Sequence, residues 1–301
     1  MRSVTRRAGL AGMAGLGLSS LGLAGFAPRS PALQSGPRTA RDVFAAIKTA
    51  SGQYWDPNPT DDRIIYGDPA TPITGIATGF FSSLALLKAA RDAGLNYIVP
   101  HEASFYERYD DFAESALTDA DPVVVAKKRF VTENRMVIQR MHGHAHSAPG
   151  DFISTGLLQH LGWDQYKLDT PRPTVRIPEA SAIEVGRHIK ATCGRRTLRM
   201  FGDPNQKVSV ISLSSGMPGE NRQIEQMETE GVNAVFLGEV REPEVLGYAQ
   251  DLAATRPIVV YLVGHTSEDY GMRLAAEWMQ SVFPDMPCRW IPTVDPYSNP
   301  A

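Results

Sequence analysis

The chain has 301 residues, of which 43% are hydrophobic and 21% are charged, and this composition excludes an intrinsically disordered protein. With a net charge of -3, the chain has no basic surface for nucleic-acid phosphates, so nucleic acid is not an expected partner. The length is sufficient for one large hydrophobic core or two ordinary ones.

The first 27 residues differ in composition from the rest of the chain. Arg6 and Arg7 precede a stretch rich in Gly, Ala and Leu that carries no charge as far as Ala27. This pattern is typical of a twin-arginine export signal that is cleaved after Ala27. The alternative is a membrane anchor, but the glycine content makes the stretch less apolar than the ~20 residues that a span needs. We therefore expect a periplasmic or secreted protein with no stable membrane span after processing.

A linker and a first helix are expected over residues 28–60, followed by an α/β domain over 61–301. Apolar residues have helical spacing over 40–50, and a Pro/Asp-rich loop follows at 56–62. Ser82 or Ser83 can cap a helix over 84–93, which Gly94 ends before a buried strand at 95–99.

The second part of the chain repeats this order. A helix is predicted over 221–230, and Gly231, a strand at 232–237 and Gly238-Glu239 follow. The segments GLNYIVPHE (94–102) and GVNAVFLGE (231–239) share Gly, Asn and Glu at equal offsets. They indicate two related halves, about 61–170 and 195–301, although chance identity over nine positions is the alternative.

Further helices are predicted at 153–161 and 181–193, and strands at 197–201 and 207–213. The alternation of strands and helices predicts an α/β fold. His160 and His188 fall within the helices and are expected to be ordinary helix residues. The two cysteines, Cys193 and Cys288, can form a disulfide in an exported protein or remain buried thiols.

Five of the seven histidines follow short apolar runs that we interpret as buried strands, at 95–99, 136–141 and 258–263. In open α/β sheets, ligands bind at the carboxyl ends of the strands, so these imidazoles are expected to converge on a metal site. The side chains of His101 and Glu102 can point toward two different ions. The alternative is a helix-capping Glu beside a hydrogen-bonded His.

The segment His142-Gly-His144-Ala-His146 is the strongest local signal for metal binding. If it is extended, residues two apart share one face, and all three imidazoles line a single surface. The alternative is a surface cluster that binds metal adventitiously. Asp151 is either a carboxylate partner or the cap of the next helix, and we favour the cap.

His265 and Glu268 are three residues apart where the third strand gives way to a helix, and this spacing places both on one face. A helix start stabilised by Glu268 is the structural alternative. The sequence has no nucleophile elbow, phosphate loop or dinucleotide fingerprint. The loop at 214–219 is only a weak candidate for holding an anion.

Taken together, these motifs resemble the NIF-three-like family of dinuclear-metal-centre hexameric proteins, often labelled GTP cyclohydrolase I type-two homologues. The resemblance runs from about Asp61 to Tyr297. It is carried by AARDAGLNYIVPHEASFY, by MHGHAH followed by GLLQHLGW, by NAVFLGE, and by VVYLVGHTSE with the helix to AEWM. It implies two related α/β halves around a dinuclear metal cleft, and a homohexamer.

By this resemblance, His101 matches the first ligand histidine of the family, and Glu102 stands where the usual pattern has a second histidine. His142 or His146 occupies the region of the usual H-x-x-x-D, with His146 at the place of the Asp. His265 and Glu268 match the closing His and Glu, although the family spacing is one residue wider. These departures resemble an exported branch with an HE motif and a triple-histidine motif.

The resemblance implies a pair of divalent transition-metal ions, either zinc, manganese or iron. The expected ligands are His101, Glu102, His142, His144, His146, His265 and Glu268. A metal-activated water would then hydrolyse a small cyclic amidine, amide or phosphoester, with Glu102 as a bridging ligand or general base. The alternative is a non-catalytic exported protein that binds or delivers metal, and a weaker one is an interaction domain with fortuitous histidines.

Overall fold

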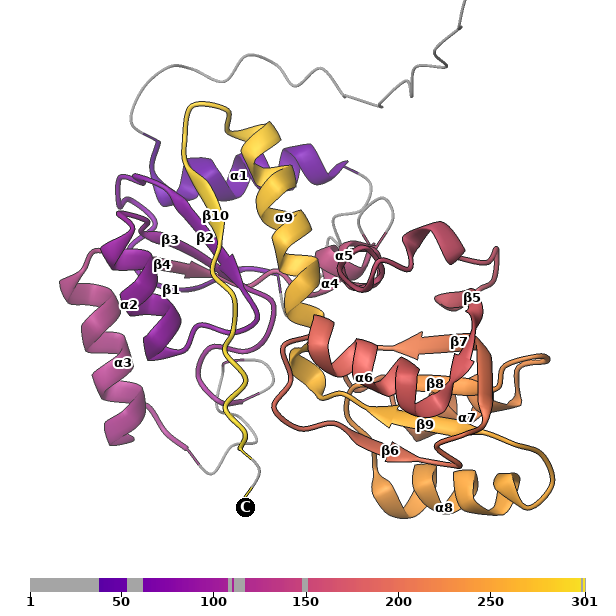
Figure 1. The fold of residues 1–301 in the computed structure, drawn as a ribbon. Helices are drawn as coiled ribbons and strands as arrows, with labels where there is room; N and C mark the ends of the chain where they lie inside the picture. Colours follow the sequence, from indigo (N-terminus) through magenta and orange to yellow (C-terminus); the bar gives the residue numbers. More distant parts are fainter. Residues whose placement is uncertain are drawn as a thin grey trace, which may run out of the picture. The chain divides into compact units, whose positions relative to one another are not determined.

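A computed structural model describes residues 38–52, 62–107, 110, 117–147, 151–298 and 300. The predicted export signal lies outside these residues. The described residues form an α/β protein with two five-stranded sheets, as the sequence predicts (Figure 1). Among the described helices, none combines the length and the apolar character that a membrane span requires.

The first sheet has the strand order β1-β4-β3-β2-β10, in which only β1 runs antiparallel to its neighbour. Its strands are β1 Ile64–Tyr66, β4 Val137–Gln139, β3 Tyr97–Pro100, β2 Ile76–Gly79 and β10 Cys288–Trp290. Helices α2 (Leu84–Asp92) and α3 (Pro122–Glu133) supply the apolar side chains that cover one face of this sheet. Helices α1 (Ala40–Ser51) and α9 (Asp269–Val282) cover the other.

The second sheet has the order β5-β7-β8-β9-β6, with antiparallel strands at both edges. Its strands are β5 Thr174–Ser181, β7 Lys207–Ser214, β8 Ala234–Leu237, β9 Val259–Leu262 and β6 Arg199–Phe201. Helices α7 (Glu220–Glu228) and α8 (Glu242–Ala253) pack on one face. Helices α5 (Phe152–Leu161) and α6 (Ala182–Thr192) pack on the other.

Most predicted elements are confirmed to within two or three residues. Ser83 caps α2 by accepting a hydrogen bond from the backbone N–H of Leu86 at 3.1 Å, and Gly94 follows with a φ of +74°. The predicted disulfide alternative is not formed, since Cys193 and Cys288 are free thiols.

The two halves share one backbone plan. The order β1-β2-α2-β3-α3-β4 recurs as β6-β7-α7-β8-α8-β9, and the sheet orders match strand for strand apart from the fifth strand. The asparagine common to both halves has the same role in each. The side-chain oxygen of Asn96 accepts the N–H of Thr74 at 2.8 Å, and that of Asn233 accepts the N–H of Val210 at 3.1 Å. The sequence match between 94–102 and 231–239 therefore reflects equivalent strands.

The helix that follows each half packs on the sheet of the other half. Helix α5 follows the first half but contributes leucines to the core of the second sheet, whereas α9 follows the second half and covers the first sheet. The two helices cross closely at Gly156 and Gly271. A Cβ on Gly156 would lie 2.5 Å from the carbonyl oxygen of Tyr270, and a Cβ on Gly271 would lie 2.5 Å from the Cα of Ile153. Helix α5 follows the segment after β4, and α9 follows the segment after β9, so the crossing connects segments that follow strands of both sheets.

Candidate metal centre

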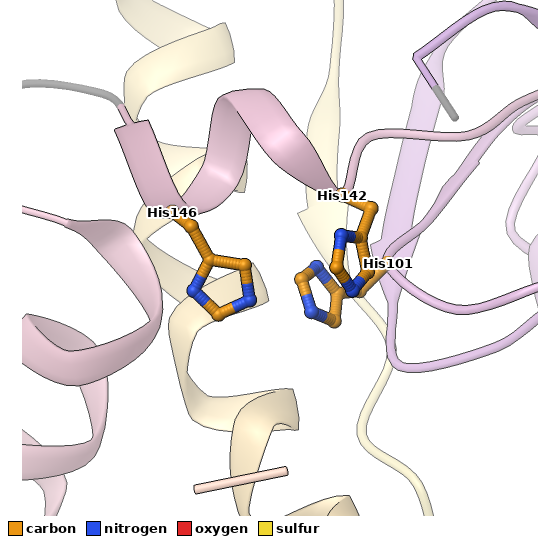
Figure 2. A group of neighbouring side chains, drawn as sticks. All are labelled: His101, His142 and His146. Atoms are coloured by element: carbon orange, nitrogen blue, oxygen red, sulfur yellow. The ribbon is translucent and has the colours of Figure 1, made fainter. Parts of the chain in front are cut away.

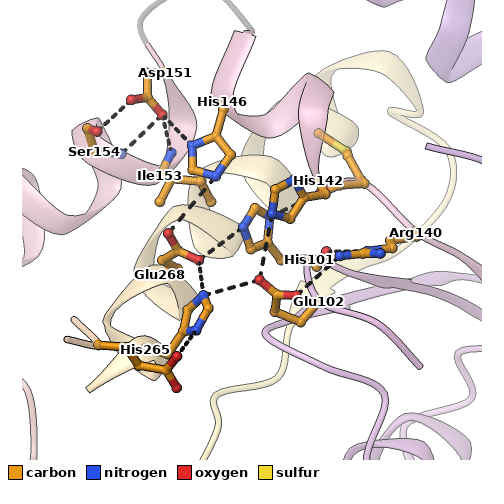
Figure 3. Close-up of polar contacts among 12 residues, drawn as sticks. His101, Glu102, Arg140, His142, His146, Asp151, Ile153, Ser154, His265 and Glu268 are labelled. Carbon is orange, nitrogen blue, oxygen red and sulfur yellow. Dashed lines mark hydrogen bonds and ion pairs between the residues drawn. The ribbon is translucent and has the colours of Figure 1, made fainter. Parts of the chain in front are cut away.

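The predicted site residues follow three strands, from both halves of the molecule. His101 and Glu102 directly follow β3, helix α4 (Gly143–Ser147) follows β4, and the 3-10 helix η3 (His265–Glu268) follows β9. Their side chains come together in one cluster (Figure 3). The prediction that these strand ends converge is therefore confirmed for His101, Glu102, His142, His146, His265 and Glu268.

The triple-histidine segment is helical and not extended, so the condition for all three imidazoles to share one face is not met. The carboxylate of Asp62, which is buried, accepts the backbone N–H groups of His142 and His144, each at 2.5 Å. These two bonds satisfy the free N–H groups at the start of a helix. In a helix, residues four apart share one face and the residue between them does not. His142 and His146 therefore face His101, and His144 does not.

His144 lies away from the cluster, in the hydrophobic core. Its Nε2 is 2.9 Å from the hydroxyl of Ser51, and its ring contacts those of Phe152 and Trp278. The side chain is almost fully buried. We therefore remove His144 from the set of candidate ligands.

Three imidazoles lie in contact with one another (Figure 2). The rings of His101 and His142 are stacked with centroids 4.5 Å apart, and the ring of His146 is 5.0 and 5.1 Å from them. One nitrogen from each ring lies within 4.8 Å of the others. Neutral imidazoles at this spacing are able to share one metal ion.

Two carboxylates complete the cluster (Figure 3). Oε2 of Glu268 lies 3.2 Å from Nε2 of His101 and 3.1 Å from Nε2 of His265. Oε1 of Glu102 lies 3.2 Å from Nε2 of His265 and 3.7 Å from Nε2 of His142. His101, Glu102 and Glu268 thus form a second group of ligand atoms within 4.8 Å of one another.

The tautomer of His101 explains why this cluster suits a cation. Its Nδ1 lies 3.2 Å from the carbonyl oxygen of Met141, and a carbonyl only accepts, so Nδ1 carries the proton. Nε2 is then the ring nitrogen left to bind a metal ion, and it lies 3.2 Å from Oε2 of Glu268. Neither atom makes a hydrogen bond of ordinary geometry among the described residues, although both are buried and Oε2 is also in an ion pair with His265. A nitrogen and a carboxylate oxygen 3.2 Å apart have the separation of two neighbouring ligands of one metal ion.

The charges within the cluster shift the protonation of its members. Burial alone would raise the pKa of Glu102, but the hydrogen bond from His265 and the nearby imidazoles lower it to about 2. Burial would likewise raise the pKa of Glu268, yet His101 and His265 hold it below its usual range. Burial would lower the pKa of His265, but the two glutamates raise it to about 10. Burial and His101 lower the pKa of His142 to about 3. Without metal, the carboxylates are ionised and His142 is neutral.

Comparison with known proteins identifies the fold around this cluster. Residues 55–296 match the family model described as Duf34/NIF3 (NGG1p interacting factor 3). The chain belongs to the NIF3 family.

Solved structures support the same fold. The Staphylococcus aureus hypothetical protein SA1388 superposes with a TM-score of 0.67 at 13% identity, over 88% of this chain and 100% of that one. A Bacillus cereus protein related to NIF3 gives 0.68 at 12% identity, over 87% and 99%. HcgD from Methanocaldococcus jannaschii gives 0.58 at 15% identity, over 86% and 99%. No curated protein matches the chain.

Two residues near the cluster of this NIF3-family chain were not anticipated from the sequence. Arg140 is buried at the end of β4 and donates to Oε2 of Glu102 at 3.2 Å and to the carbonyl oxygen of His101 at 3.1 Å. Asp62 caps the histidine helix. Nothing in the local sequence around either residue indicates such a contact, because the partners are 38 to 82 positions away along the chain.

The loop at 214–219 approaches the cluster through its backbone. Gly216 has a φ of +65°, and a Cβ at this position would lie 2.2 Å from Oε1 of Glu268. Only glycine therefore allows the loop to lie against this carboxylate. The sequence made this loop only a weak candidate for holding an anion, and the structure places it against the carboxylate of Glu268.

Asp151 has both of the roles considered for it. Its carboxylate caps α5 by accepting the N–H groups of Ile153 and Ser154 at 3.1 and 3.2 Å, and Oδ1 lies 3.7 Å from Nδ1 of His146. The two remaining histidines are structural, as predicted. His160 and His188 each direct Nε2 toward a backbone carbonyl oxygen, that of Thr192 or Leu161, at 2.8 and 2.9 Å.

Proposed function

We propose that this NIF3-family protein binds two divalent transition-metal ions between its halves and hydrolyses a small molecule of the cyclic amidine, amide or phosphoester class. The observation that carries the proposal is that Nε2 of His101 and Oε2 of Glu268 are buried 3.2 Å apart without a hydrogen bond of ordinary geometry. Four imidazoles and two carboxylates in one cluster exceed the ligands that a single tetrahedral ion uses. Such a mixed nitrogen and oxygen set suits zinc, manganese or iron.

The contacts limit how two ions could share these ligands. His101 has one free nitrogen, since Nδ1 is bonded to Met141, so it can serve one ion only. The oxygens of Glu268 face different neighbours: Oε2 faces His101 and His265, and Oε1 lies 4.0 Å from Nε2 of His146. Glu268 would therefore be able to hold metal with either oxygen, one on the side of His101 and His265 and one on the side of His146.

Glu102 is restricted to one functional oxygen. Arg140 holds Oε2, which leaves Oε1 directed toward His142 and His265. When bound, two divalent ions supply an activated water and polarise the bond to be cleaved. The ionised Oε1 of Glu102 can accept a hydrogen bond from that water and orient it, and Arg140 fixes the carboxylate in this position.

Metal content and turnover test the proposal in sequence. Protein folded in the cytoplasm and purified gently should carry close to two equivalents of zinc, manganese or iron by elemental analysis. The loaded protein is then assayed against cyclic amides, cyclic amidines and phosphoesters, with His101→Ala as the matched inactive control. Absence of metal, with no uptake on titration, contradicts the whole proposal. Two equivalents of metal without turnover identify a metal-binding protein without hydrolase activity.

We also propose export by the twin-arginine pathway, based on Arg6, Arg7 and the uncharged stretch to Ala27. Replacement of both arginines by lysine keeps the charge but removes the recognised pair, so the precursor should stay in the cytoplasm. Normal export of the double-lysine variant would refute this proposal. The homohexamer implied by the family resemblance is a further prediction, which sedimentation of the purified protein tests.

A further inference from the structure

Equivalent glutamates follow the equivalent strands β3 and β8. Glu102 follows β3 by two residues and Glu239 follows β8 by two residues, at the same offset from the shared asparagine. The backbone also agrees: the N–H of Met141 donates to Pro100 at 2.9 Å, and the N–H of Val263 donates to Leu237 at 2.8 Å. The internal repeat therefore brings one carboxylate from each half to the same end of the molecule.

Both glutamates contact His265, but on opposite nitrogens. Oε1 of Glu102 lies 3.2 Å from Nε2, and Oε2 of Glu239 lies 3.4 Å from Nδ1. The first contact is directed into the cluster. The second is on the side of the imidazole that faces away from Glu102 and Glu268.

The residue before each glutamate explains why the two halves differ. His101 precedes Glu102, whereas Gly238 precedes Glu239. A Cβ on Gly238 would lie 2.5 Å from both the backbone nitrogen and the backbone oxygen of Gly216, so this position excludes any side chain. The end of β8 therefore cannot supply a counterpart of His101, and Glu239 contacts the cluster only through His265.

An acceptor near Nδ1 is common to three histidines of the cluster. The carbonyl oxygen of Met141 takes this place for His101, Asp151 for His146 at 3.7 Å, and Glu239 for His265. An acceptor there fixes the ring and directs the lone pair of Nε2 toward the metal. In each case, the Nε2 atom is the one that faces Glu268.

We propose, building on the metal function proposed above, that Glu239 is a positioning residue: it accepts the Nδ1–H of His265 and holds Nε2 of that ring toward the metal ions. Glu239 is not itself a ligand in this arrangement. Its side chain is half-exposed, so its replacement removes the contact without opening the core. Glu102 is thus a candidate metal ligand in the first half. Its counterpart Glu239 affects the metal ions only through His265.

The contact is tested first without metal. In protein labelled with nitrogen-15 at histidine, the exchange rate of the Nδ1–H proton of His265 with water is measured, with His265→Gln to assign the signal. Glu239→Ala should speed this exchange at least about tenfold, because the acceptor is lost. The control is Glu242→Ala, which removes a nearby exposed glutamate that pairs with Arg199 instead. Equal exchange in wild type and Glu239→Ala overturns the proposal, whether or not the protein binds metal.

The effect on metal binding is tested next, by titration with zinc and with cobalt. Glu239→Ala should weaken binding by about 10- to 100-fold, the usual cost of removing an outer partner of a ligating histidine. Glu239→Gln retains an acceptor oxygen and should recover part of that loss, and Glu242→Ala should bind like wild type. A wild-type protein that takes up neither metal refutes the proposed function, while the exchange experiment still decides the contact. Equal losses in Glu239→Ala and Glu242→Ala would show a general charge effect and overturn the positioning role.

Discussion

The two halves of the molecule have the same backbone plan but contribute different side chains to the cluster. In the first half, β3 ends in His101-Glu102 and β4 leads to His142 and His146. In the second half, β8 ends in Gly238-Glu239, and β9 leads to η3 with His265 and Glu268. The scaffold determines where side chains meet, and the local sequence determines which of those places hold a ligand. The candidate site therefore draws side chains from both halves, whose helices α5 and α9 cross at Gly156 and Gly271.

The largest effect on metal affinity is expected for His101, which has no counterpart in the second half. His101→Ala removes the residue common to both candidate ligand groups, so metal affinity should fall by more than about 100-fold, beyond the cost of losing an outer partner. Titration with zinc measures the loss. His188→Ala is the control, because His188 stacks on Trp163 and bonds to the carbonyl oxygen of Leu161. A His101→Ala variant that binds metal like wild type would place the metal site elsewhere.

His142, His144 and His146 distinguish the candidate ligand face of α4 from the face that packs in the core. His142→Ala and His146→Ala should each weaken metal binding by about 10- to 100-fold, because their nitrogens lie 3.7 and 4.0 Å from the two carboxylates. His144→Ala should leave affinity unchanged and lower the free energy of unfolding by about 1–3 kcal/mol, since His144 is buried against Ser51. Loss of metal in His144→Ala without loss of stability would contradict the assignment of faces.

This segment also marks the limit of prediction from the sequence. The convergence of the strand-end residues was predictable, because the carboxyl ends of parallel strands lie at one edge of a sheet. The helical conformation of 143–147 was not, because a five-residue helix shows no periodicity and its cap, Asp62, is 80 residues upstream of His142. Likewise, the repeat pointed to Glu239 as an equivalent of Glu102, but only the structure places it against His265.

A smaller effect is expected from Gly216, through which the loop at 214–219 lies against Glu268. Gly216→Ala should lower the free energy of unfolding by about 1–2 kcal/mol, because its φ of +65° is unfavourable for other residues. It should also weaken metal binding by about tenfold, because the added methyl group displaces the carboxylate of Glu268.

Gly219→Ala is the matched control for this loop. Gly219 has a φ of +99°, but a Cβ there would meet nothing within 4 Å. Thermal unfolding and zinc titration should show a loss of stability alone in Gly219→Ala, and of both stability and affinity in Gly216→Ala. Equal affinities in the two variants would mean that the loop does not position Glu268.

The smallest effect is expected where the two halves are most alike, at Asn96 and Asn233. The side-chain oxygen of each asparagine accepts a backbone N–H, from Thr74 for Asn96 and from Val210 for Asn233. Each side-chain NH2 group also donates to a backbone carbonyl oxygen. Both lie at the amino ends of β3 and β8, and the candidate ligands follow the carboxyl ends of strands. Asn96→Ala and Asn233→Ala should therefore each lower the free energy of unfolding by about 1 kcal/mol, by similar amounts, and leave zinc affinity unchanged. Urea unfolding and zinc titration measure the two quantities. If one variant lost metal while the other did not, the asparagine would have different roles in the two halves, and the shared backbone plan would not account for its repetition.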